Sequence, residues 1–181
     1  MRATKILLLI FILSFSSCYT TKRLIRENDF ETSGFNNQSI NGIYSNGLND
    51  SIPKNLWVKL KSSYTDKTDT INLDINNNVK LTMLNSENLK IQLLDKTGKS
   101  VIDEFDLKGR IKGNFFTIDR KLTLYPFIPV YYVNMETKTI LGNDLNGNLV
   151  LVTGSVNEAM ILMVAGGNRH VQNHKFNRIK N

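Results

Sequence analysis

The sequence has few of the residues on which common catalytic and metal sites depend. Its 181 residues include one cysteine and two histidines, and they contain no Gly-x-Ser-x-Gly motif. Nucleophilic catalysis needs a nucleophile, a base within hydrogen-bond reach and a group that orients the base. A phosphate-binding glycine loop is also missing. We therefore expect no catalytic residues, no resident metal and no cofactor.

Two groups of polar residues come nearest to a site. His170 and His174 are four residues apart, which on a helix would place both imidazoles on one face as half of a zinc site. No third ligand is close in the sequence, so we expect solvated histidines in a polar tail. Asp103 and Glu104 would point to opposite faces of a strand, which favours a charged outer face over a catalytic carboxylate pair.

The charge of the chain is basic, with 23 Lys and Arg against 16 Asp and Glu and a net charge of +7. A basic surplus favours anionic surfaces such as lipid headgroups. The basic residues are spread along the chain, so we expect no nucleic-acid partner. An ordinary basic surface explains the charge at least as well.

The first eighteen residues have the pattern of an export signal. Two basic residues precede an uncharged, mostly apolar stretch from Ile6 to Phe15, which is too short for the roughly 20 residues of a spanning helix. Two serines then precede Cys18. This arrangement resembles the lipobox of bacterial lipoproteins, although Phe15 stands where leucine is common. The resemblance implies removal of residues 1–17 and acylation of Cys18, while an ordinary signal peptide with an incidental cysteine is the alternative.

The segment after the cysteine is polar and has no sustained period. We interpret residues 18–38 as the lipidated cysteine and a flexible tether, with Lys22, Arg23 and Arg26 close to the anchor. A surface-export signal of Bacteroidota lipoproteins would be acidic here. The basic segment therefore favours a lipid anchor in the outer membrane that faces the periplasm.

Short alternating runs separated by turn residues follow residue 40. Gly98 is expected in a left-handed turn conformation, and Asn146-Gly147 is a strong hairpin signal of type I′. This spacing predicts an all-β fold, an antiparallel barrel or a sandwich, with one short helix or a strand near residues 53–61. The predicted strands are 70–75, 79–84, 89–94, 101–107, 115–119, 122–125 and 149–152.

The segment 39–46, with Gly42 and Tyr44 in a Gly-x-aromatic step, resembles the opening strand of lipocalin-like lipoproteins of Bacteroidota. The resemblance implies a lipocalin-like β-barrel over residues 39–168. Residues 169–181 are basic and polar, and we expect a partly mobile tail there.

Two apolar segments are candidates for function. Residues 125–132 contain the candidate ligand-binding side chains Tyr125, Phe127, Tyr131 and Tyr132, together with two prolines that exclude a central strand. An aromatic loop at a barrel mouth could bind a small apolar ligand, whereas rings that fill the end of the barrel are the alternative. The run from Met160 to Ala165 is apolar on both faces, which predicts a covered central strand or a buried helix.

These observations lead to one expectation and one alternative. We expect a membrane-anchored, non-enzymatic periplasmic lipoprotein that binds a small apolar ligand or supports an envelope assembly. The alternative is a protein-interaction module, such as an inhibitor or an accessory subunit of an outer-membrane complex. In that case the apolar run near residues 159–165 would form the interface.

Overall fold

The computed structural model describes residues 19–36, 38–47, 55–65, 76–127, 130–162 and 164–179. Within these ranges the chain is mostly β, with ten antiparallel strands in one sheet and two short helices. In chain order the elements are α2 (Thr21–Arg26), β1 (Gly42–Ser45), α3 (Leu56–Tyr64), β2 (Asn78–Met83), β3 (Asn88–Leu94), β4 (Val101–Lys112), β5 (Phe115–Ile118), β6 (Lys121–Phe127), β7 (Tyr131–Asn143), β8 (Leu149–Ile161), β9 (Val164–Phe176) and β10 (Arg178–Ile179).

The sheet is long and bends at β4. Its strand order is β10-β1-β2-β3-β4-β5-β7-β8-β9, with β6 also paired to β7. Residues of β4 up to Lys108 pair with β3, and those from Gly109 onward pair with β5. A Cβ at Gly109 would lie 2.4 Å from the carbonyl oxygen of Thr117, so glycine permits the close approach of β4 and β5.

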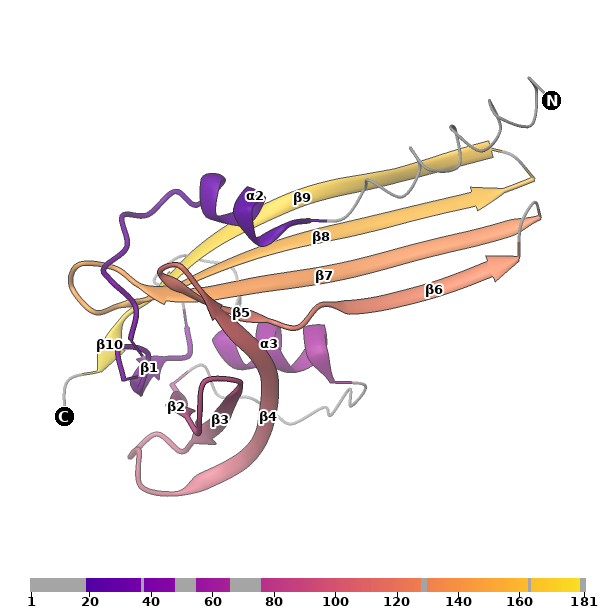
Figure 1. Cartoon of the computed structure of the whole chain (residues 1–181). Coiled ribbons are helices and arrows are strands. Elements are labelled where there is room, and N and C mark those ends of the chain that lie inside the picture. The colour runs from indigo at the N-terminus through magenta and orange to yellow at the C-terminus, as the bar shows by residue number, and fades with distance from the viewer. Residues whose placement is uncertain are drawn as a thin grey trace.

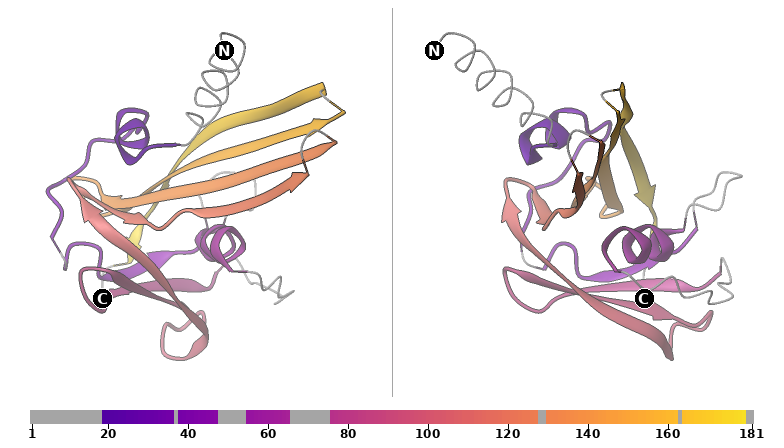
Figure 2. Two further views of the ribbon diagram at one scale, coloured as in Figure 1. Left: turned by 45° about the vertical axis from the view of Figure 1, so that its right-hand side comes forward. Right: turned by 90° about the vertical axis from the view of Figure 1, so that its right-hand side faces the viewer.

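The bend places the two halves of the sheet on opposite sides of α3 (Figures 1 and 2). We call the four adjacent strands β6, β7, β8 and β9 the blade. Helix α3 lies against one face of the blade, and α2 lies against the other (Figure 2). The main hydrophobic core surrounds α3, where Leu56, Trp57 and Leu60 are each no more than 1% exposed.

Helix α3 confirms the helical alternative for the segment near residues 53–61. The Asn55 side chain caps the helix and accepts a hydrogen bond of 2.7 Å from the backbone N–H of Val58. Leu56, Trp57 and Leu60 then recur at helical spacing on the face that meets the core.

The tether prediction for residues 18–38 is wrong for most of the described part. Thr20 caps α2 by accepting a hydrogen bond from the backbone N–H of Arg23, and Tyr19 and Leu24 are buried against the blade. Further along, the backbone N–H of Ser33 donates to the carbonyl of Asn143. Burial of two large side chains holds this segment on the sheet. The segment shows no periodic pattern in sequence because a six-residue helix is too short to produce one.

The sheet is not closed into a barrel, so the lipocalin-like barrel prediction is wrong, although the all-β character is confirmed. Asn177 separates β9 from β10, and these two strands pair with different neighbours, β8 and β1. The outer half of the blade pairs only within itself. Closure requires the strands to tilt and their register to stagger together. The 13-residue strands β7, β8 and β9 are much longer than the four-residue β1, which pairs with β10 and β2.

The predicted domain end at residue 168 and the polar tail at 169–181 are also wrong. Strand β9 runs from Val164 to Phe176 and pairs with β8 along its whole length. Strand β10 then pairs with β1, which joins the C-terminal end of the described chain to the first strand of the sheet. Backbone pairing does not need apolar side chains, so a polar edge strand resembles a tail in sequence.

The local signals for strands are confirmed in six of the seven predicted segments, and β4, β6 and β8 are longer than expected. Residues 70–75 lie outside the described residues. Gly98 has the expected positive φ of 71°. The Asn146-Gly147 hairpin joins β7 to β8, but it is not a type I′ turn, because Gly147 has a φ of 82° and Asn146 does not have a positive φ. The Asp144 carboxylate instead organises this turn by accepting hydrogen bonds from the backbone N–H groups of Asn146 and Asn148.

Candidate functional site

The outer end of the blade is formed by two hairpins that lie side by side (Figure 1). The β6–β7 and β8–β9 hairpins are joined through the pairing of β7 with β8, in which Tyr131 lies opposite Ile161. The backbone N–H of Leu162 also donates to the carbonyl of Val130 over 2.9 Å. We call residues 125–127, 130–133, 159–162 and 164–166 the blade tip.

One row of four large apolar side chains crosses the end of the blade tip. The strand register aligns Phe127, Tyr131, Ile161 and Val164 on the face that further back meets α3. Their exposed fractions are 70%, 41%, 56% and 76%, respectively. Large apolar side chains are more often buried in a core. Because all four are exposed here, the whole row is available to a partner.

The next row on the same face continues the apolar surface. Tyr125 pairs with Val133, Val133 with Ala159, and Ala159 with Gly166. Tyr125 is 53% exposed. Together the two rows make a contiguous apolar surface across all four strands, which is a recognised mark of an interaction site.

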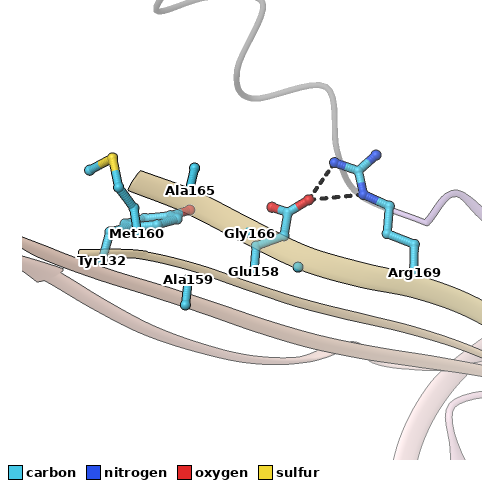
Figure 3. A pocket seen from close by; sticks show the side chains of 8 residues that line it. Tyr132, Glu158, Ala159, Met160, Ala165, Gly166 and Arg169 are labelled. Carbon is cyan, nitrogen blue, oxygen red and sulfur yellow. Dashed lines mark hydrogen bonds and ion pairs between the residues drawn. The ribbon is translucent and has the colours of Figure 1, made fainter. Parts of the chain in front are cut away.

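The opposite face of the blade is hollowed at the blade tip and just behind it. An open hollow of about 490 Å³ lies there, lined by Tyr132, Glu158, Ala159, Met160, Ala165, Gly166, Gly167 and Arg169. Tyr132 and Met160 lie together at one end, and the ion pair of Glu158 and Arg169 closes the other end (Figure 3). The Arg169 Nε donates to the Glu158 carboxylate over 2.9 Å.

Charged residues are missing from both hairpins of the blade tip. Residues 124–134 and 159–168 contain no Asp, Glu, Lys or Arg. The pairing of β7 with β8 brings these two segments together. The blade tip is therefore apolar on both faces and across its turns, and the Glu158–Arg169 ion pair lies behind it.

Leu162 adds strain at the same place. It has a φ of 47° and is 69% exposed. A left-handed conformation is rarely adopted by residues other than Gly, Asn and Asp. An exposed leucine in such a conformation is unfavourable in two ways, and strained residues of this kind cluster at functional sites.

The four predicted ligand-binding residues all lie in the blade tip. Tyr125 and Phe127 are in β6, which is an edge strand as the prolines required, and Tyr131 and Tyr132 begin β7. Tyr132 points to the face opposite the other three. The exposed fractions of Tyr125, Phe127 and Tyr131 contradict the alternative in which their rings fill the fold.

The prediction for Met160 to Ala165 is wrong. This run is the turn between β8 and β9 with the adjoining strand ends, and Ile161, Leu162 and Val164 are all exposed. An apolar run on both faces predicts a covered strand because most such strands are central, but here the strands extend beyond the rest of the fold. The signal that could have identified it is the pair of charge-free segments.

The other polar candidates do not assemble into a site. His170 and His174 lie on strand β9 instead of a helix, where four residues span about 13 Å, so they cannot share one metal ion.

Asp103 and Glu104 point to opposite faces as predicted. Asp103 bonds Lys61 of α3 over 2.5 Å, so its face meets the core region instead of solvent, whereas Glu104 bonds Lys90 over 3.2 Å on the outer face. Among the described residues no group of three or more His, Cys, Asp or Glu could hold a metal.

The fold and site together define a mostly β protein with an open antiparallel sheet and an exposed apolar end. No helix among the described residues is long and apolar enough to cross a membrane. No protein-family model, no curated protein and no solved structure matches the chain. Cys18, the predicted lipidation site, lies outside the described residues.

Proposed function

We propose that this protein is a non-enzymatic lipoprotein of the cell envelope that binds an apolar partner through its blade tip. In this proposal residues 1–17 are removed and acylated Cys18 anchors the chain in the outer membrane, facing the periplasm. The observation that carries the proposal is the exposed row of Phe127, Tyr131, Ile161 and Val164.

The energetics support binding at this surface. Burial of a fully exposed side chain of this size contributes about 1.5–3 kcal/mol, and four such side chains lie in one row, each between 41% and 76% exposed. Covering the row therefore contributes on the order of several kcal/mol. An open surface replaces the enclosed cavity that a lipocalin-like barrel would have supplied.

The chemistry of the hollow supports binding more than catalysis. The hollow is lined by two charged side chains, Glu158 and Arg169, which form an ion pair with each other. Tyr132 is the other ionisable residue of the lining. A general acid or base has to exchange a proton with substrate, whereas this carboxylate is already engaged with a guanidinium. The remaining lining is apolar or glycine.

The strand edges favour a second candidate function, a protein-interaction module. Strands β6 and β9 are the two edges of the blade, and within the described residues neither pairs with another strand on its outer side. Unpaired edges accept an added strand from a partner protein. A stable complex with an envelope protein that is lost on adding proline to β9 would support this candidate over a lipid or small apolar ligand.

Intact mass spectrometry of the protein from its native membrane tests the anchor. The expected mass corresponds to loss of residues 1–17 with acyl chains added, and Cys18→Ala is expected to lack the acyl mass. An unmodified, soluble wild-type protein would contradict the anchor. Binding at the blade tip is tested separately by comparing Phe127→Ser with wild type for retention of apolar ligands or envelope proteins.

A further inference from the structure

We propose that the partner of the blade tip is the lipid bilayer itself, so that the protein is held at the membrane at two points. This inference rests on the proposed acylation of Cys18. It specifies the lipid surface as the apolar phase that covers the blade tip. The first reason is the shape of the apolar surface.

Apolar side chains surround the blade tip instead of covering one side of it. Phe127 and Val164 lie on one face, Tyr132 and Met160 on the other, and Leu162 lies at the turn. A folded partner usually covers one face of a sheet, because the second face points away from it. A fluid apolar phase contacts both faces and the turns at once.

The depth of the apolar region matches shallow insertion. Phe127 and Tyr125 occupy successive rows on one face, about 7 Å apart at the ordinary rise of a strand. Interfacial segments insert about 5–10 Å into the boundary between headgroups and acyl chains. The unpaired edges of β6 and β9 limit insertion to this depth, because hydrocarbon cannot satisfy backbone N–H and C=O groups.

The order of side chains along the blade agrees with a membrane boundary. Aliphatic Ile161 and Leu162 are outermost, and Tyr125, Tyr131 and Tyr132 lie beside or just behind them. Tyrosine is enriched at membrane interfaces because its ring is apolar and its hydroxyl is polar. The Glu158–Arg169 ion pair follows at the level where water and headgroups are available.

The position of the anchor makes simultaneous attachment geometrically feasible. Tyr19, the residue after Cys18, is 3% exposed and packs on Gly154 in the middle of β8. Gly154 is seven residues from Ile161, about 23 Å along the strand. Tyr19, to which Cys18 is covalently joined, thus lies on the face of the blade that carries α2. In this proposal that face turns toward the bilayer so that the lipid reaches it.

The same face carries positive charge next to the anchor. Lys22 and Arg26 of α2 are exposed, and each basic residue near an anionic membrane contributes about 1 kcal/mol. The expected arrangement is an inclined blade, with acylated Cys18 and α2 at one contact and the blade tip at the other.

Site-directed fluorescence on the mature lipoprotein tests this arrangement. Cys18 is the only cysteine in the chain, and acylation blocks its thiol, so an introduced cysteine is labelled selectively. Leu162→Cys is labelled with bimane, and Lys99→Cys, in the exposed loop between β3 and β4, is the matched control. Phe127→Cys provides a second probe on the other hairpin of the blade tip.

The labelled proteins are reconstituted in vesicles of phosphatidylethanolamine and phosphatidylglycerol with brominated acyl chains. We expect several-fold quenching of bimane at positions 162 and 127 by the brominated lipid, and none at position 99. Equal iodide quenching at all three positions, without quenching by lipid, would overturn the inference. Protection of position 162 in native membranes but not in vesicles would also overturn it and would indicate a protein partner.

The mass of each purified sample separates failure of the inference from failure of the proposed function. An acylated protein whose blade tip is not quenched by lipid contradicts the inference alone. A protein that lacks acyl chains contradicts the proposed anchor and the two-point attachment together.

Discussion

Tyr19 packs directly on Gly154, and the missing side chain at Gly154 makes the contact possible. A Cβ at this position would lie 2.7 Å from Cγ of Tyr19 and 2.8 Å from Cδ2 of Leu24. The first described residue of the chain is therefore held on the middle of the blade. For a protein anchored at Cys18, this contact leaves almost no flexible chain between lipid and fold.

Gly154→Ala is expected to loosen the N-terminal segment from the blade. The added methyl group overlaps Tyr19 and Leu24, and overpacking of this kind costs about 1–3 kcal/mol. We expect a lower urea midpoint and faster trypsin cleavage within α2, which contains three basic residues. Gly166→Ala is the control, because no atom lies within 4 Å of its added Cβ. Equal stability of the two variants would contradict the contact.

Leu162→Gly is expected to stabilise the fold and to weaken the function. Glycine adopts positive φ without the cost of about 1–2 kcal/mol that a left-handed conformation imposes on other residues, and Leu162 has a φ of 47°. We expect a raised melting temperature and reduced insertion of the blade tip into vesicles, measured by bimane at position 127. Lower stability of the variant would show that the leucine side chain supports the fold.

Phe127→Ala is expected to leave stability nearly unchanged, whereas Phe116→Ala is expected to be severely destabilising. Phe127 is 70% exposed, and Phe116 is fully buried in the main core. Loss of a buried phenylalanine costs about 3–5 kcal/mol, and an exposed substitution usually changes stability by about 0.5 kcal/mol or less. Urea unfolding of both variants gives the comparison. A large loss for Phe127→Ala would mean that the blade tip belongs to the core.

Asp103→Asn is expected to destabilise the packing of α3 against the sheet. Lys61 is 8% exposed, bonds Asp103 over 2.5 Å and lies 5.5 Å from the centre of the Trp57 ring. Removal of the carboxylate takes one charge-assisted hydrogen bond from a buried ammonium, which costs about 1–3 kcal/mol. Glu104→Gln is the matched control, because its pair with Lys90 is exposed and such pairs contribute about 0–1 kcal/mol. Equal effects in thermal unfolding would contradict a special role for Lys61.

Asp144 is expected to make stability depend on pH in the acidic range. Burial raises the pKa of its carboxyl, but hydrogen bonds from Asn148 and Asn146 and the charge of Lys175 outweigh burial and hold the pKa below its ordinary value. The folded state thus binds the proton less tightly than the unfolded state, whose pKa is about 3.9. The stabilisation is present above the unfolded pKa and is lost as the pH falls through the folded pKa.

Urea unfolding of Asp144→Asn and wild type at neutral and acidic pH checks this sign. The variant is expected to be less stable at neutral pH by about 1–3 kcal/mol, and the difference is expected to shrink at the acidic pH. Asp119→Asn is the control, because Asp119 is exposed and its Oδ1 lies 3.7 Å from Nη2 of Arg110 in a long surface ion pair. A difference that stays constant with pH would contradict the depressed pKa of Asp144.

Local signals predicted the individual strands and several turns. Alternating residues identified β2 and β3, and Gly98 identified the turn that follows β3, because side-chain alternation and positive φ depend on neighbours in the chain. The edge position of β6 also followed from its proline. The aromatic side chains Tyr125, Phe127 and Tyr131 were predicted to bind a ligand at a barrel mouth. The structure places them exposed at the end of an open sheet, and their binding role stays a prediction.

The errors arose where a pattern has the same appearance in two environments. Polar residues of β9 resemble a tail, yet they form an edge strand whose backbone pairs with β8. The apolar run from Met160 to Ala165 resembles a buried strand, yet it projects into solvent. The spacing of His170 and His174 suits a helix, and only the strand assignment excludes a shared metal.

The sequence alone determined the β-rich character, the positions of the main turns and the two segments without charge, because each depends on residues close together in the chain. Tertiary structure decided that the two charge-free segments lie side by side and that nothing described in the fold covers them. It also decided that Tyr19 is held on the blade at Gly154. Burial depends on which elements pack together, and strand lengths and pairing partners set that packing.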